Sequence, residues 1–369
     1  MRSFAALPEE SGSYSDLLQK SKSKGDIIMA KYIFMLNLQL FAEMNTNVTT
    51  DSGLSPEMKT FYDKVLIREA SANLVHAQFA QKKPIPKNGG KTIEFRKFSN
   101  LPKALTPLTE GVTPDGKKLD VTSLTATVSQ YGDYVVVSDM LELTAIDNTI
   151  VEALTMIGKQ AGLTLDTIVR NVLVAGSNVN YCPKVASDGT ETEVTSRASL
   201  DSTCRLTVKQ VEKVAAKLKA NNVPKINGSY VAIIHPYVAY DLMRDKDWRH
   251  PHQYVDTKNI YSGEIGEIGG VRFVETSEAA IFYGDGCPTG LGVFATLFLG
   301  ANAYGDTEIT GGGLETIVKQ KGSAGTADPL NQRSSIGWKS TKTAERLIEN
   351  YIVRVESCSE YSSAVTGPN

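Results

Sequence analysis

Residues 92–129 read TIEFRKFSNLPKALTPLTEGVTPDGKKLDVTSLTATVS, and this stretch decides the fold. Its two ends, Thr92–Arg96 and Leu124–Ser129, alternate apolar with polar residues at period two, which predicts two strands with one buried face each. Between them, Ser99–Leu119 holds three prolines and two glycines, too many breakers for a central strand. We therefore predict a long extended tip that joins two strands of one arm.

A connection of this length is uncommon within a compact domain unless it packs against something else. In an assembling protein, that something would be a neighbouring subunit.

The composition indicates a globular protein of more than one unit. The chain has 369 residues, of which 22% are charged and 41% hydrophobic, and its formal net charge is -2. This length suggests two or three units, and this balance is typical of a soluble, folded chain. Binding of nucleic acid through a dense basic surface is not indicated.

The cysteines and the apolar runs place further limits on the class of protein. Four cysteines lie far apart without any CxxC pair, so we predict no zinc site, no disulfide framework and production in a reducing cytosol: Cys182, Cys204, Cys287 and Cys358. The longest apolar run, Ile27–Phe41, is interrupted by polar residues and is shorter than the roughly 18 to 20 residues of a membrane span. It also lacks a small-residue cleavage site, which argues against secretion.

The first residues have the character of an arm. Lys24-Gly25-Asp26 can be encoded by a purine-rich ribosome-binding sequence, so we expect translation to start at Met29 or Met35 and residues 1–28 not to be translated natively. The polar stretch Met44–Gly53 then predicts an arm or linker.

Two helices are predicted on either side of the extended loop. The first begins with Ser55 as N-cap and Pro56 at the first helical position, and its apolar stripe continues to Phe79. The second runs from an Asp147 cap to Gly176 and spans roughly 40 Å.

Two spacings of four residues occur along the second helix. Gly158 and Gly162 predict close contact with a sheet or a second helix. Asp166 and Arg170 predict a surface ion pair.

The remaining chain mixes helices and strands. A polar loop at Asn178–Asp201 is followed by an amphipathic helix at Thr207–Leu218. Strands are then predicted at Tyr230–Ile234, Val271–Thr276, Val293–Leu299, Leu314–Gln320 and Tyr351–Glu356. Because these elements cluster by region and do not alternate strictly, the fold class is α+β.

The sequence contains no convincing catalytic, phosphate-binding or metal-binding motif. Lys87–Thr92 ends like a phosphate-binding loop but lacks the first glycine and leads into a strand. His250-Pro251-His252 with Asp256 lacks further ligands at a familiar spacing, and His235 has no nucleophile elbow.

Three further features have ordinary structural explanations. Gly311–Gly313 predicts a turn. We interpret His76 as a packing or surface residue, and Asp245 and Asp247 as carboxylates that are close in sequence by chance. We predict no catalytic, cofactor-binding or metal-binding residues, and no enzyme.

The order of these parts resembles the major capsid (major head) proteins of tailed bacteriophages, the Hong Kong 97 type. Three parts of the sequence show this resemblance. Leu36–Glu43 is similar to the opening of many phage head proteins, and Ser129–Tyr134 is similar to the return strand of the extended loop. Phe298–Gly305, together with Val318–Trp338, is similar to the C-terminal region of the branch typified by coliphage N-four. The resemblance covers residues 36–356.

The resemblance implies a division of the chain. It places the arm at 1–53, the extended loop at 84–139 and the axial domain at 224–339. Residues 54–83, 140–223 and 340–369 would form the peripheral domain, with a spine helix at 147–175 and Tyr351–Glu356 in its sheet.

The resemblance also implies a function. The chain would self-assemble into hexamers and pentamers, forming the icosahedral head that encloses phage DNA without sequence-specific binding. It would be assembled in the host cytoplasm and reside in the virion. Its expected partners are other copies of itself, a scaffolding protein, a portal and a decoration protein, with no membrane.

Three alternatives remain open. An encapsulin-type bacterial nanocompartment shares the fold but holds a cargo enzyme. A hydrolase on an α+β scaffold would need a convergent acid, base and nucleophile. A tail protein would show repeats or an all-β pattern.

Overall fold

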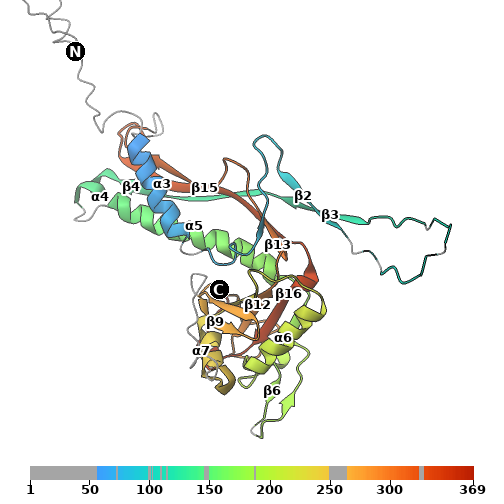
Figure 1. Cartoon of the computed structure of the whole chain (residues 1–369). Helices are drawn as coiled ribbons and strands as arrows, with labels where there is room; N and C mark the ends of the chain where they lie inside the picture. Colours follow the sequence, from blue (N-terminus) through green and yellow to red (C-terminus); the bar gives the residue numbers. More distant parts are fainter. Residues whose placement is uncertain are drawn as a thin grey trace, which may run out of the picture. The chain divides into compact units, whose positions relative to one another are not determined.

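The computed structural model describes residues 56–71, 74–98, 101, 103–108, 110–113, 115–144, 149–186, 188–248, 264–323 and 328–369. The predictions about the arm at 1–53, the translation start and the His250, His252 and Asp256 group lie outside these residues. Figure 1 shows the arrangement of the helices and strands.

Two helices pack against each other through glycines. They are α3 (Pro56–Ser71) and α5 (Thr149–Val174). A Cβ atom on Gly162 would lie 2.5 Å from the backbone oxygen of Ala70, and one on Gly158 would lie 3.0 Å from Glu69 Cβ. The prediction of close contact at these glycines is therefore confirmed, and the partner is a helix.

The first helix is shorter than its apolar stripe predicts. It begins at Pro56 as expected but ends at Ser71 instead of continuing to Phe79. The backbone N–H of His76 donates to Asp166 Oδ1 at 2.7 Å, so a carboxylate of α5 takes a donor that a continuing helix would use. Phe79 is buried in a different core from α3.

One sheet has five strands. In order they are β1 (Gln81–Lys82), β13 (Tyr304–Thr307), β15 (Arg333–Arg346) and β14 (Glu315–Lys319), with β4 (Ser129–Ser138) also paired to β15. Strand β15 runs antiparallel to β4 over ten residue pairs. Helices α3 and α5 cover one face, where Leu66, Leu154, Ile157, Ile336 and Trp338 form a buried core.

The other large sheet has seven strands. Its order is β5 (Val179–Tyr181), β16 (Ile352–Ser357), β12 (Val293–Leu299), β8 (Tyr230–Ile234), β10 (Val271–Glu275) and β9 (Glu264–Ile268), with β11 (Ile281–Phe282) paired to β12. Helices α6 (Val208–Ala220) and α7 (Pro236–Arg244) contribute to the core on one face. Val169 and Leu173 of α5 contribute to the core on the other. Strands β8 and β12 are consequently buried along their whole length.

The predicted extended loop forms a separate hairpin. Strands β2 (Thr92–Phe98) and β3 (Val121–Thr127) pair antiparallel over seven residue pairs and join neither large sheet. Figure 1 shows this hairpin reaching away from the two sheets. The string Ser129–Tyr134, expected in the loop's return strand, begins β4 and therefore belongs to the five-stranded sheet.

Shorter elements fill the connections. They are α4 (Asp139–Thr144), β6 (Lys184–Val185), β7 (Glu191–Thr192) and single 3₁₀ turns at Arg197–Ser199, Glu349–Tyr351 and Ser362–Ala364. Gly311 has φ +83°, in agreement with the turn predicted there.

The strand pairing differs from the expected domain boundaries. The boundary predicted between residues 339 and 340 falls inside β15, which is a single strand of 14 residues. The strand expected at Tyr351–Glu356 forms as β16, but it pairs with β12 and β5 and not with the five-stranded sheet. Pairing partners are set by long-range contacts, which alternation along one segment does not contain.

The glycine contact predicts an unusual substitution effect. Replacing Gly162 by alanine should lower the free energy of unfolding by about 1–3 kcal/mol, because the added Cβ overlaps the α3 backbone. In an open helix the same change would stabilise by about 1 kcal/mol. Urea unfolding measures the difference, with Gly116→Ala as a control because no atom lies within 4 Å of that Cβ position. Equal or greater stability of Gly162→Ala would contradict the proposed contact.

Candidate interaction surfaces

The tip of the hairpin exposes large apolar side chains. Leu105 and Leu108 are 82% and 78% exposed. Other described residues of this region are exposed by half or more: Leu101, Val112, Leu119 and Val121. Several large apolar side chains exposed on one segment favour an interaction site there.

The base of the hairpin, in contrast, is anchored. Phe95 is buried against Gly305, where an added Cβ would lie 2.6 Å from the Phe95 ring. Lys83 Nζ lies 5.5 Å from the centre of the same ring and donates to the Glu94 carbonyl at 2.9 Å. The hairpin therefore has a fixed base and an exposed tip.

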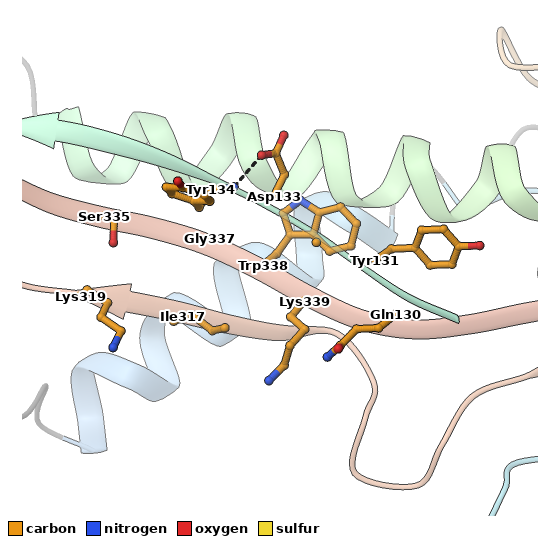
Figure 2. Close-up of a pocket in the computed structure, with 11 residues that line it drawn as sticks. Gln130, Tyr131, Asp133, Tyr134, Ile317, Lys319, Ser335, Gly337, Trp338 and Lys339 are labelled. Atoms are coloured by element: carbon orange, nitrogen blue, oxygen red, sulfur yellow. Dashed lines mark hydrogen bonds between the residues drawn. The ribbon is translucent and has the colours of Figure 1, made fainter. Parts of the chain in front are cut away.

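A groove of about 520 Å³ lies on the five-stranded sheet, on the face opposite α3 and α5. Figure 2 shows it crossing β4, β15 and β14. Gly132 of β4 and Gly337 of β15 have no side chains to fill its floor, while Tyr134, Ile317 and Lys319 line it. Tyr134 is 68% exposed.

Packing beneath the groove explains its shape. Trp338 is buried on the helix side, and its Nε1 donates to Gln160 Oε1 of α5 at 3.4 Å. Gln160 Nε2 donates to Asp133 Oδ2 at 2.6 Å, and this hydrogen bond lowers the pKa of Asp133. A Cβ on Gly337 would lie 2.8 Å from Tyr134 Cβ, so this part of the floor accepts only glycine without movement.

The groove and the middle of the tip carry charges of opposite sign. Lys319 and Lys339 line the groove, with Lys339 also 3.3 Å from Glu315. Residues 104–116 of the tip contain Glu110 and Asp115 and no basic residue, whereas Lys103, Lys117 and Lys118 lie at the two ends of the tip. Only the middle of the tip is therefore complementary in charge to the lysines of the groove.

Further large apolar side chains are exposed near one end of the five-stranded sheet. They belong to β4, α4 and α5: Tyr134, Val135, Val136, Met140, Leu141, Leu143 and Met156. The groove is not recognisable from periodicity alone. The sequence feature that could have indicated it is a pair of glycines, Gly132 and Gly337, within segments that resemble strands.

The histidines within the described chain have structural roles. His235 Nδ1 accepts the Tyr237 N–H at 3.1 Å and thus caps α7, and burial lowers its pKa to about 4. His76 is fully buried, with Nδ1 2.6 Å from Asp166 Oδ2.

The surface ion pair predicted between Asp166 and Arg170 is wrong. Both residues are buried, because α5 is covered along this length. Asp166 contacts His76, whereas Arg170 donates to the Glu278 carbonyl at 3.0 Å and the Asn369 backbone oxygen at 2.9 Å.

The other candidates for chemistry are explained by turns and caps. Residues Lys87–Thr92 turn through left-handed Asn88 and Gly90 and enter β2, so they form no helix-opening phosphate loop. Asp245 Oδ2 accepts the Val208 N–H and caps the start of α6. Among the residues described, no group of three or more potential ligands could hold a metal ion, and no helix is long and apolar enough to cross a membrane.

The family comparison identifies the chain. The family model described as "Phage capsid protein" matches residues 76–321, about two thirds of the sequence. The chain belongs to this family of phage capsid proteins. A search of curated protein sequences finds no match.

Solved capsid structures share the fold. The capsid of Ralstonia phage GP4 matches with a TM-score of 0.59 and 14% identity, covering 87% of this chain and 97% of that one. The capsid of cyanophage P-SCSP1u matches with a TM-score of 0.57 and 12% identity, covering 76% and 87%. The capsid of cyanophage Pam1 matches with a TM-score of 0.54 and 12% identity, covering 73% and 85%. The predicted α+β fold of tailed-phage capsid proteins is confirmed.

The cap at His235 predicts a pH dependence. Its folded-state pKa of about 4 lies below its ordinary value of 6.5, so the unfolded chain binds the proton more readily between these values. This contribution to stability is complete above pH 6.5 and is lost as the pH falls toward 4, by up to roughly 3 kcal/mol. His235→Asn retains a cap without a titrating ring, so its unfolding midpoint should fall less over this range. Parallel pH profiles for the two proteins would contradict the assignment.

Proposed function

We propose that this phage capsid protein forms hexamers and pentamers that close into an icosahedral head around phage DNA. The observation that supports this most directly is the hairpin, which has an anchored base and an uncovered apolar tip. Such a tip gains burial only when another molecule covers it. In this proposal the groove of a second copy covers the tip, and its lysines meet Glu110 and Asp115 in the middle of the tip.

Symmetry explains how moderate contacts would suffice. A closed shell repeats the same interface many times, so each tip–groove contact can be weak while the whole remains stable. A near-neutral net charge of -2 also suits a container, because packed DNA need not be gripped through its phosphates.

The two sheets suggest a revised division of the chain. In this proposal the five-stranded sheet with α3 and α5 is the peripheral domain, and α5 is its spine helix. The seven-stranded sheet with α6 and α7 is the axial domain. The extended loop then covers 84–128, because β4 is a strand of the peripheral sheet.

The proposal includes partners and location. A scaffolding protein, a portal and a decoration protein would assist assembly in the host cytoplasm, and the product would reside in the virion without catalysing a reaction. The family match favours this function over the nanocompartment alternative.

Removing the tip should separate folding from assembly. Shortening Ser99–Leu119 to a tight turn should leave a folded, soluble chain, since Leu105 and Leu108 contribute nothing to its cores. Particles should be absent by electron microscopy and light scattering, both from residues 29–369 and from the full chain. Lys209→Ser, at an exposed position of α6, serves as the control that still assembles. Particles of normal size from the shortened chain would refute the role of the tip.

Charge reversal tests the pairing of tip and groove. Lys319→Glu should slow assembly about tenfold, because like charges would then meet across the contact. Adding Glu110→Lys and Asp115→Lys to the same chain should restore the rate. Light scattering at two salt concentrations measures both, since salt should reduce the difference. Failure of the compensating changes would show that these surfaces do not meet.

A further inference from the structure

The segment that leads into the hairpin, together with strand β2, carries an excess of positive charge. Between residues 82 and 97 the sequence has one carboxylate, Glu94, and six basic side chains, which we call the basic patch: Lys82, Lys83, Lys87, Lys91, Arg96 and Lys97. All six are exposed. The segment has a charge of +5, and since the whole chain sums to -2, the remaining residues sum to -7. The near-neutral net charge of the chain conceals this local excess.

The backbone that carries the basic patch is held in place. Ile85 is buried, its N–H donates to the Glu308 carbonyl at 2.9 Å, and its carbonyl accepts the Thr310 N–H at 2.8 Å. The turn that follows is closed by the Gly89 N–H, which donates to the Pro86 carbonyl at 2.9 Å. A ligand of the patch would therefore need to order side chains but little backbone.

The two halves of the patch are neighbours in space. A pocket of about 410 Å³ lies between the segment before the turn and strand β2. Its lining comes from both: Lys83, Pro86, Gly89, Thr92 and Arg96. The cations on either side of the turn therefore face solvent around one shared pocket.

Most of these cations have no carboxylate partner. Glu94 Oε2 lies 3.6 Å from Arg96, and both side chains are largely exposed. No described carboxylate forms an ion pair with the other lysines of the patch that are free of Glu94: Lys82, Lys87, Lys91 and Lys97. On helix α6, in contrast, Lys209 and Lys213 both pair with Glu191. A cluster of uncompensated cations on one surface favours an external polyanion.

We propose that the basic patch binds the phosphate backbone of double-stranded DNA without reading its sequence. Lysine ammonium groups bind phosphates as point charges, and each contact releases counterions from the duplex. Duplex DNA has one charge per about 1.7 Å of its axis, so several lysines can meet phosphates at once without a matching fold. An acidic polypeptide would need its carboxylates arranged to fit the patch.

The patch would add a local contact to a container whose net charge is near neutral. That the bound duplex is phage DNA inside a head rests on the proposed function. Binding itself can be measured on unassembled protein, so failure to assemble and failure to bind DNA are distinguishable.

The experiment measures how the affinity for DNA depends on salt. Fluorescence anisotropy follows binding of a short labelled duplex to the full chain, purified as unassembled protein. With about five phosphate contacts, a plot of log affinity against log salt concentration should have a slope of about -4.5. Between about 50 and 200 mM salt the affinity should therefore fall roughly 500-fold. Duplexes of different sequence should bind equally.

Two double variants locate the contact. Lys87→Gln with Lys91→Gln removes two contacts, so the slope should change to about -2.7 and the loss of affinity over the same range to roughly 40-fold. The matched control, Lys209→Gln with Lys213→Gln, removes the same charge from α6 and should keep the slope of the unaltered chain. Equal unfolding temperatures of the three proteins show that each is folded.

Several results would overturn the proposal. They are a slope near zero, the same loss of binding in both double variants, or displacement of the duplex by poly-glutamate as effectively as by unlabelled DNA of equal charge. The last result would assign the patch to an acidic polypeptide. Electron microscopy scores assembly separately, so a chain that binds DNA with the expected slope but forms no particles would contradict only the proposed function.

Discussion

The structure depends on the way the carboxyl end of α5 joins the two sheets. Arg346 of β15 donates to the Val172 carbonyl at 2.7 Å, while Arg354 of β16 donates to the carbonyls of Val174 and Gly176. The last carbonyls of a helix have no partners within it, and cationic donors there also complement its dipole. Since the two arginines come from different sheets, this helix end fixes both sheets to one element.

The exposed surfaces follow from that arrangement. Helices α3 and α5 pack together through Gly158 and Gly162 on one face of the five-stranded sheet, and the described chain leaves the groove on its other face open. The hairpin is fixed only at Phe95 and its surroundings, so its tip also stays open. A single chain thus satisfies its cores while leaving two surfaces uncovered, and the proposed shell would join them.

Much of this architecture could be predicted locally. The start of α3 follows from Pro56, the long α5 from its apolar stripe, and the hairpin from two alternating segments around a proline-rich tip. The predictions of the first helix's end and of the Asp166–Arg170 ion pair were wrong because residues distant in sequence bind the groups concerned. Asp166 ends the helical run before His76 and is unavailable as a surface partner for Arg170.

The sequence by itself determined most helices and strands, the α+β class and the extended conformation of the proline-rich tip. Periodicity and proline content are local properties, so they can be recognised within each segment. Only the tertiary structure decided that β4 and β16 belong to different sheets and that Gly132 and Gly337 open a groove. These features depend on strand partners far apart in sequence. Register and proximity between such segments are settled by packing of the whole core, which no single segment encodes.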